Sequence, residues 1–176
     1  MTRPLLSLVL ALTALTAPAQ ERPLLPSITD ATWREHRDYY PKSPACAANE
    51  ITLWTCETHK RVFSLCSSQV LNRASGYMQY RALSGGKVVF TYPAVKKPPL
   101  GSFKFNSSPT GNASVEFTNN GYHYRLYDRL RGNSSIFVSE PGPSGKTTEI
   151  ECGSNQTLQV NYTLRLMYDS GIWEGD

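Results

Sequence analysis

Apolar and polar side chains alternate along most of the chain after Tyr40, with a period of about two residues. The longest such run covers 158–167, where Leu, Val and Tyr side chains alternate with polar ones. Shorter runs rich in β-branched and aromatic residues are separated by turns that contain Gly, Pro or Asn. No segment after Tyr40 shows the period of an amphipathic helix, about 3.6 residues. We therefore expect an all-β domain, folded as an antiparallel β-sandwich or as a closed β-barrel.

The clearest hairpin is centred on Asn120-Gly121, a dipeptide that favours a two-residue type I′ turn. Such a turn sets the register of both strands, because residues at equal distance from it pair with each other. The predicted pairs are Val115 with Leu126, Phe117 with Tyr124 and Asn119 with Tyr122 on one face, and Glu116 with Arg125 on the other. Apolar pairs on one face and an opposite-charge pair on the other agree with the preferences of cross-strand neighbours.

Turn residues elsewhere divide the chain into further short strands. Gly85-Gly86 predicts another tight turn, and Pro93, Pro98-Pro99 and the 140–145 loop interrupt strand pairing. The remaining strands are expected at 76–82, 87–92, 102–106, 134–139, 147–152 and 158–167.

An earlier hairpin joins 51–56 to 61–66 through the polar run 57–60. If Thr58 and His59 form a two-residue turn, Glu57 faces Lys60. Alternation then gives a core face of Trp54, Cys56, Phe63 and Leu65, and an opposite face of Ile51, Leu53, Val62 and Cys66. A slip of one residue would exchange the two faces.

The four cysteines, Cys46, Cys56, Cys66 and Cys152, predict two disulfides in an exported chain. The hairpin register separates Cys56 from Cys66 by about 16 Å along the strands. A disulfide needs Cα atoms within about 7 Å, so the hairpin and a Cys56–Cys66 bridge exclude each other. Two connectivities remain open: Cys46–Cys56 with Cys66–Cys152, or Cys46–Cys66 with Cys56–Cys152.

Residues 1–19 have the layout of a signal peptide. A short cationic start, Met1 to Pro4, precedes an apolar run over 5–15 and a small-residue cleavage signal at 17–19. The apolar run is too short to span a bilayer. We expect an exported, soluble chain without a membrane span, located in a secreted or periplasmic space.

The rest of the chain divides into three parts. Residues 20–49 form a Pro-rich N-terminal arm, in which 30–38 could fold as a short helix capped by Thr29 or Asp30. The antiparallel β domain covers 50–170, and 171–176 form a C-terminal tail.

Charge and motif content argue against several classes of function. The 18 Lys and Arg exceed the 14 Asp and Glu by only four, and apart from Lys96-Lys97 the basic residues are scattered, which argues against nucleic-acid binding. His36, His59 and His123 are far apart, and the sequence has no Cys-x-x-Cys, His-Glu-x-x-His, Gly-x-Ser-x-Gly or phosphate-loop motif. We expect no metal, no cofactor and no catalytic residues, although a Ser–His–Asp triad could assemble from distant positions.

The candidate binding residues lie on one turn and the strand that follows it: Ser75, Gly76, Tyr77, Tyr80 and Arg81. The chain has ten tyrosines, and most are interpreted as half-buried rings that pack on the outside of a sheet. Tyr77 differs because the Ser75-Gly76 corner comes directly before it. A tyrosine on such a corner offers apolar area with a polar tip, which suits contact with a protein or a sugar.

Two resemblances involve this region. Cys56, Lys60, Ser64 and Cys66, followed by the Gly76-Tyr77-x-Gln79-Tyr80-Arg81 strand, resemble a group of small exported bacterial proteins without an established activity. The Ser75-Gly76 corner also resembles the Ser-Gly-x-x-Tyr loop of the bacterial lysozyme inhibitors, although Tyr77 and Tyr80 fall at other spacings. The second resemblance implies a disulfide-bonded antiparallel β-barrel that inserts a loop into a lysozyme.

The sequence therefore favours an exported, soluble β-domain with a binding or envelope-associated, non-enzymatic role. Its partner would be another protein, such as a lysozyme, or an envelope component. An inhibitor of a lysozyme-type glycosidase is the alternative, and a secreted hydrolase is a third hypothesis. An inhibitor should expose Ser75 and Arg81 on a rigid loop that can enter a cleft lined by two carboxylates.

Overall fold

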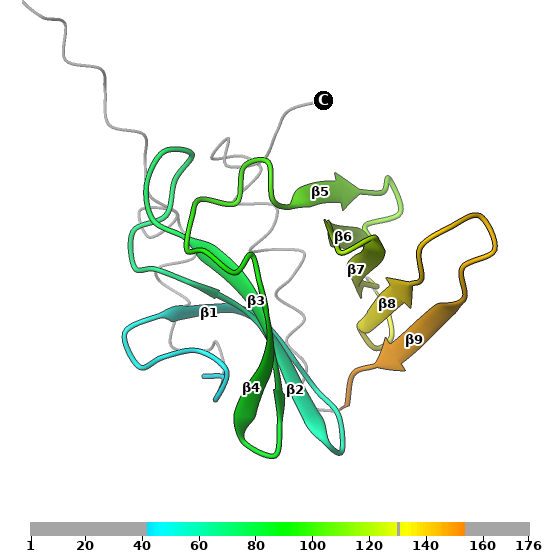
Figure 1. The fold of residues 1–176 in the computed structure, drawn as a ribbon, viewed down its shortest axis with the longest axis horizontal. Coiled ribbons are helices and arrows are strands. Elements are labelled where there is room, and N and C mark those ends of the chain that lie inside the picture. The colour runs from blue at the N-terminus through cyan, green and yellow to red at the C-terminus, as the bar shows by residue number, and fades with distance from the viewer. Residues whose placement is uncertain (1–41, 130, 154–176) are drawn as a thin grey trace, which may run out of the picture.

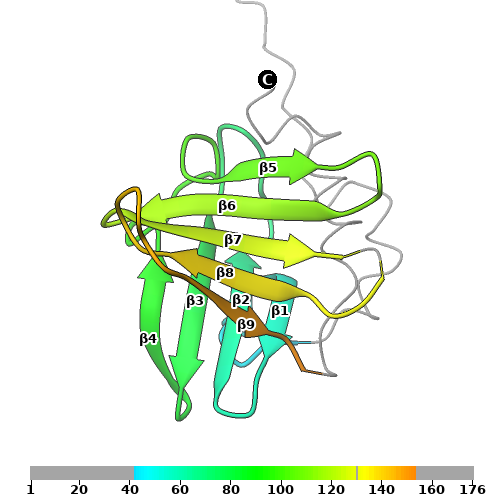
Figure 2. The ribbon, with the colours of Figure 1, turned by 90° about the vertical axis from the view of Figure 1, so that its right-hand side faces the viewer.

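The computed structural model describes residues 42–129 and 131–153, which form two antiparallel sheets (Figure 1). One sheet has the strand order β1-β2-β3-β4, with strands β1 (Ile51–Glu57), β2 (Arg61–Ser67), β3 (Met78–Ser84) and β4 (Lys87–Tyr92). The other has the order β5-β6-β7-β8-β9, with strands β5 (Lys104–Ser107), β6 (Ala113–Asn119), β7 (Tyr122–Asp128), β8 (Ser135–Ser139) and β9 (Thr147–Glu151). The strands of the two sheets cross at a steep angle (Figure 2).

The expected all-β class is confirmed, and the described part of the chain contains no helix. Its strands stay in two separate sheets, so the architecture is that of a β-sandwich. Within the described ranges no helix is long and apolar enough to cross a membrane. The predicted signal peptide, the helix at 30–38, the strand at 158–167 and the tail lie outside the described residues.

Both sheets contribute aromatic rings to one core. Phe117 on β6 stacks between Tyr92 and Tyr124, with ring centroids 4.4 and 4.7 Å away. Tyr80 on β3 lies 5.2 Å from Phe117 and 6.3 Å from Phe63. Stacked and tilted ring pairs of this kind stabilise a core beyond the area that they bury.

The β6–β7 hairpin has the predicted register. Asn120 and Gly121 both have positive φ, 50° and 80°, as a type I′ turn requires. Val115 pairs with Leu126, Phe117 with Tyr124, Asn119 with Tyr122 and Glu116 with Arg125, as expected. The Gly85-Gly86 turn is also confirmed, whereas β3 begins at Met78 because Gly76, at φ 81°, still belongs to the preceding turn.

The register predicted for the β1–β2 hairpin is wrong by two residues, because Glu57 pairs with Val62 rather than with Lys60. The turn is longer than two residues because the Thr58 hydroxyl accepts hydrogen bonds from the backbone N–H groups of Lys60 and Arg61. A shift of two preserves the faces, so the predicted core face is buried: Trp54, Cys56, Phe63 and Leu65.

The second face of this hairpin is also covered. The register shifts between Thr52 and Trp54, and this bulge lets Leu53 join the same core as Trp54. Cys66 and Val62 pack instead against Ala45, in the last part of the N-terminal arm. Residues 42–49 of the arm therefore cover the outer side of β2.

The disulfides are Cys46–Cys66 and Cys56–Cys152, with Cα atoms 5.4 and 5.2 Å apart. The exclusion of a Cys56–Cys66 bridge is confirmed, and the structure selects the second of the two open connectivities. Cys46–Cys66 fastens the arm to β2, and Cys56–Cys152 joins β1 to the end of β9. Two disulfides indicate that the domain folds in an oxidising compartment.

We expect mass mapping of the unreduced protein to give these two linked peptides and no alkylated thiol. Replacing both cysteines of one bridge by serine should lower the free energy of unfolding by about 3 kcal/mol for Cys46–Cys66 and about 5 kcal/mol for Cys56–Cys152. The second bridge closes the longer loop and so restricts the unfolded chain more. Urea denaturation measures both values, and equal losses would contradict this loop-length argument.

Candidate functional site

A buried carboxylate, that of Glu50, is the centre of the region that contains the candidate binding residues. Its side chain is 1% exposed and lies just before β1. Arg81 on β3 binds it with both ends of its guanidinium group, at 2.6 Å and 2.8 Å. The Tyr77 hydroxyl donates to Oε1 at 2.6 Å, and the Ala47 backbone N–H donates to Oε2 at 2.7 Å. The carboxylate therefore accepts four short hydrogen bonds.

Arg81 extends this network to two other segments. It donates to the carbonyl oxygen of Ala45 in the arm and to the side-chain oxygen of Gln79. Gln79 in turn donates to the carbonyl oxygen of Pro93, after β4. One set of polar contacts thus connects the arm, β3 and the segment that follows β4.

Lys96 completes the cluster at the surface. Its ammonium group lies 3.0 Å from the Tyr77 hydroxyl, 3.6 Å from a Glu50 carboxylate oxygen and 4.2 Å from the centre of the Tyr77 ring. The Lys96 side chain is 55% exposed, whereas Arg81 is 12% exposed. Lys96 is therefore the cation of this cluster that solvent or a partner can reach.

These contacts decide the charge state of the cluster. Burial alone would raise the pKa of the Glu50 carboxyl, but hydrogen bonds from Arg81, Tyr77 and the Ala47 backbone outweigh it and lower the pKa to about 2. The hydrogen bonds to Glu50 in turn raise the pKa of the Arg81 guanidinium. At neutral pH Glu50 is a fully paired anion, which suits a structural role.

The backbone conformation and close packing of Gly76 make the Ser75-Gly76 corner rigid. A Cβ atom on Gly76 would lie 2.0 Å from the carbonyl oxygen of Val70, and φ is +81° there, so only glycine fits. The Ser68 hydroxyl donates to that same carbonyl and accepts the backbone N–H of Tyr77. The loop from Ser68 to Tyr77 is thus held by its own hydrogen bonds.

The five candidate residues do not form one surface. Ser75 and Gly76 are exposed and Tyr77 is half-buried at the rim of the cluster. Arg81 is not exposed as an inhibitory residue was expected to be, because it neutralises Glu50. Tyr80 is 2% exposed and belongs to the core.

Strand alternation in the sequence distinguishes the residues of the polar cluster from the core residue Tyr80. Tyr77, Gln79 and Arg81 alternate with Met78 and Tyr80, so the two sets must lie on opposite sides of β3. Glu50 and Lys96 were not predicted as part of the site. They come from the segments before β1 and after β4, and no local motif connects them.

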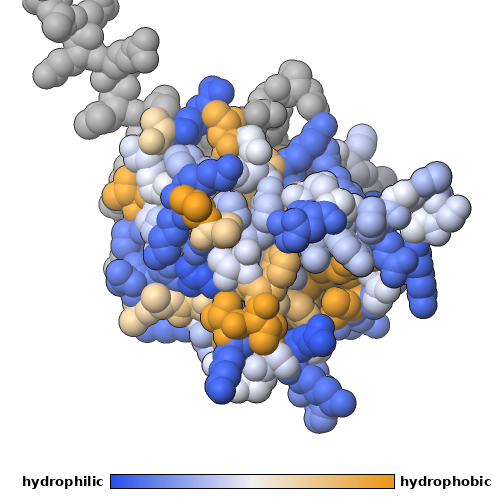
Figure 3. All heavy atoms as spheres, in the orientation of Figure 1, coloured by the Kyte–Doolittle hydropathy of each residue, from blue (hydrophilic) through white to orange (hydrophobic). Residues whose placement is uncertain are grey.

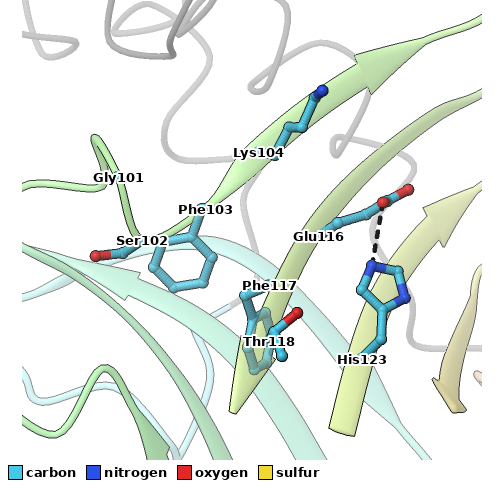
Figure 4. A pocket seen from close by; sticks show the side chains of 8 residues that line it. All are labelled: Gly101, Ser102, Phe103, Lys104, Glu116, Phe117, Thr118 and His123. Carbon is cyan, nitrogen blue, oxygen red and sulfur yellow. Dashed lines mark ion pairs between the residues drawn. The ribbon is translucent and has the colours of Figure 1, made fainter. Parts of the chain in front are cut away.

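A second candidate is a shallow pocket between β5 and β6, with a cavity volume of about 290 Å³ (Figure 4). It is lined by Gly101, Ser102, Phe103, Lys104, Glu116, Phe117, Thr118 and His123. His123 Nε2 lies 3.3 Å from a Glu116 oxygen. The Ser102 hydroxyl points away from His123, on the far side of the Phe103 ring (Figure 4). The pocket thus holds an acid–imidazole pair, with Thr118 opposite His123 in the register and the Ser114 hydroxyl donating to Glu116 at 3.0 Å.

Two cysteine sulfur atoms and a carboxylate oxygen come close together at one place in the described residues, but they do not form a metal site. Cys46, Glu50 and Cys66 have such atoms within 4.8 Å of one another. The two sulfurs are joined in a disulfide and the carboxylate is bound by Arg81, so none of the three is available to an ion.

Comparison with protein-family models, with curated protein sequences and with solved structures finds no match for this chain. The function must therefore be argued from the geometry of these surfaces.

We expect the Glu50 cluster to make stability depend on acid pH. The folded-state pKa of about 2 lies below the ordinary value of 4.5, so the stabilisation is complete above pH 4.5 and is lost as the pH falls toward 2. It amounts to about 3 kcal/mol. Glu50→Gln should be less stable than wild type at pH 7, since it leaves the buried Arg81 charge without its partner, and the difference should shrink below pH 4.5.

Urea denaturation between pH 7 and pH 2.5 measures this difference. Glu140→Gln, at an exposed glutamate in the β8–β9 loop, is the matched control and should keep the acid dependence of the wild type. A gap between wild type and Glu50→Gln that stays constant with pH would show that Glu50 is not the titrating group.

Proposed function

We propose that this chain is an exported, soluble, non-enzymatic binding domain of a secreted or periplasmic space, and that its partner is another protein. The contact would be made by the corner surface, which we define as Val70, Ser75, Tyr77, Val95 and Lys96. The predicted signal peptide and the two disulfides support export.

The main observation behind this proposal is that two valines are exposed, one in the loop before β3 and one in the segment after β4. Val70 is 54% exposed and Val95 is 73% exposed. The Val70 carbonyl packs against Gly76, and Lys96, next to Val95, packs on the Tyr77 ring. Apolar side chains that are exposed around a half-buried tyrosine are typical of protein-interaction sites.

The rigidity of the corner supports the same proposal. Tyr77 is fixed at its hydroxyl by Glu50 and Lys96 and at its backbone by Ser68. Side chains that are already ordered lose little conformational entropy when a partner binds. A rigid tyrosine with a cation beside it could therefore act as an anchor for a partner protein.

A second apolar patch lies over β4, at the edge of its sheet (Figure 3). It contains Val88 and Val89, which are 54% and 60% exposed. The pairing with β3 is irregular opposite Val89, because Leu83 pairs with Val88 and Ala82 with Phe90. Such bulges protect an edge strand against pairing with other chains, so this patch is the weaker candidate.

Inhibition of a lysozyme-type glycosidase is the second candidate function. Lys96 favours it, because an exposed ammonium group on a rigid corner could enter a cleft lined by two carboxylates. Ser75 and Tyr77 would lie at the edge of the same contact. Arg81 and Tyr80 would support this surface from inside and would not touch the enzyme.

We expect the corner surface to determine which proteins bind to the domain when it is mixed with a cell-envelope extract. At least one protein should be retained by wild type and be reduced tenfold or more with Val70→Ser/Val95→Ser. Val88→Ser/Val89→Ser removes a comparable, slightly smaller exposed apolar area from β4 and should retain that protein like wild type. Mass spectrometry of the retained proteins measures the ratios, and a set of proteins that is unchanged by the corner variant would contradict the proposal.

The inhibitor candidate is tested by a separate assay of cell-wall lysis. The wild type at micromolar concentration should slow cell-wall lysis by at least one type of lysozyme. Lys96→Ala should weaken this effect tenfold or more, about 1.4 kcal/mol. Lys87→Ala, at an exposed lysine on β4, should not. If no lysozyme type is slowed, the inhibitor candidate is excluded while the corner surface can still bind another protein.

A further inference from the structure

The outer face of the five-stranded sheet carries a second group of aromatic and charged side chains. Leu126 and Ile136 point into the core, so their neighbours along β7 and β8 point outward. These outward residues are His123, Arg125 and Tyr127 on β7, and Ser135 and Phe137 on β8. β7 is the middle strand of the sheet, and no other described strand lies in front of this face (Figure 2).

Arg125 is stacked on the two rings of this face. The centre of its guanidinium group lies 4.6 Å from the Phe137 ring centroid and 5.3 Å from the Tyr127 ring centroid. Phe137 is its cross-strand partner, and the two rings meet edge to face at 6.0 Å. Stacking on aromatic rings fixes the plane of a guanidinium group while its N–H donors stay available.

The charge of Arg125 has no partner among the described residues. Glu116 lies opposite Arg125 in the register, but its carboxylate contacts His123 at 3.3 Å and Ser114 at 3.0 Å. Arg129 also lies near the Tyr127 ring, at 5.5 Å, but unlike Arg125 it has hydrogen-bond partners. It donates to Glu149, to Ser135 and to the Asn133 carbonyl. Arg125 thus keeps five N–H donors that no described side chain uses.

We propose that Arg125 binds a carboxylate of an acidic polysaccharide on this face. A guanidinium fork with a fixed plane matches the two oxygens of a carboxylate. Glu116 and Glu149 can accept hydrogen bonds from sugar hydroxyls beside it, and His123 and Arg129 can donate them. The parts of the Tyr127 and Phe137 rings that Arg125 does not cover add apolar surface beside it.

The surrounding charges select this ligand over other anions. Glu116, Glu149 and Glu151 on neighbouring strands would repel a densely charged polymer such as a nucleic acid or a heavily sulfated glycan. A uronic-acid polymer carries isolated carboxylates between neutral hydroxyl groups, which fits one unpaired cation among acceptors. An extended peptide is a poorer fit, since it would add to a sheet edge rather than lie on a sheet face.

This site lies on the opposite sheet from the corner surface, so its test does not depend on the proposed protein partner. Calorimetric titration of the full chain should show binding of polygalacturonate. The neutral polymer obtained by reducing its carboxyl groups should not bind. Dextran sulfate and double-stranded DNA should bind more weakly than polygalacturonate.

Two substitutions with the same change in net charge isolate the role of Arg125. Arg125→Gln should weaken polygalacturonate binding tenfold or more. Arg73→Gln, at an exposed arginine in the loop before β3, should change it less than twofold. Arg125→Lys keeps the charge without the fork and should also lose most of the affinity. Thermal unfolding of each variant confirms that it is folded.

The proposal is overturned if wild type does not bind polygalacturonate, or if it binds the sulfated polymer or DNA at least as tightly. Equal losses in Arg125→Gln and Arg73→Gln would also overturn it, because they would mean attraction by net charge alone. The comparison of ligands uses only the wild type, so it stands even if an Arg125 variant fails to fold.

Discussion

A buried carboxylate must be surrounded by donors, and this requirement explains how the arm, the four-stranded sheet and the segment after β4 are held together. Glu50 satisfies it with both ends of Arg81, with Tyr77 and with the Ala47 backbone. Removing Arg81 would leave the Glu50 charge unpaired in a place where solvent can hardly compensate it. Residues 42–49 of the arm are therefore part of the domain, and the Cys46–Cys66 bridge, whose sulfurs lie within 4.8 Å of a Glu50 carboxylate oxygen, reinforces the same connection.

The same network determines what the surface can offer to a partner. Because Arg81 is used inside, the accessible cation is Lys96, and because Tyr77 is held by Glu50, its ring cannot move freely. A structural ion pair thus produces a rigid corner with exposed valines around it. The five-stranded sheet carries a different chemistry, a stacked arginine without a counter-ion among the described residues. One sandwich thereby presents two surfaces of different chemistry, for which we propose two different classes of ligand.

The sequence predicted the fold where short-range rules apply. Asn120-Gly121 set the β6–β7 register because its turn leaves no alternative, and alternation identified the core face around Trp54 and Cys56. The β1–β2 register was wrong because the Thr58 hydroxyl lengthens the turn. This local hydrogen bond is invisible in the hydrophobic pattern. The choice of disulfides depended on where the arm packs, which is a tertiary contact.

The candidate site was predicted only in part, for a similar reason. The Ser75-Gly76 corner is visible in the sequence, but Glu50 lies 31 residues before Arg81 and no motif pairs them. Tyr80 was grouped with Tyr77 because they are close in sequence, although strand alternation places them on opposite sides. Contacts between distant segments created the cluster, and these contacts follow from the packing rather than from any single stretch.

The ionisation of Glu50 in the folded protein tests this account most directly. An NMR titration of the Glu50 side-chain carboxyl carbon in the full chain would follow it without perturbing the cluster. We expect a midpoint near pH 2, with the carboxylate fully ionised at pH 4 and above. A midpoint near the ordinary value of 4.5 would mean that Arg81 and Tyr77 do not bind this carboxylate, and it would contradict the rigid corner on which the proposed function rests.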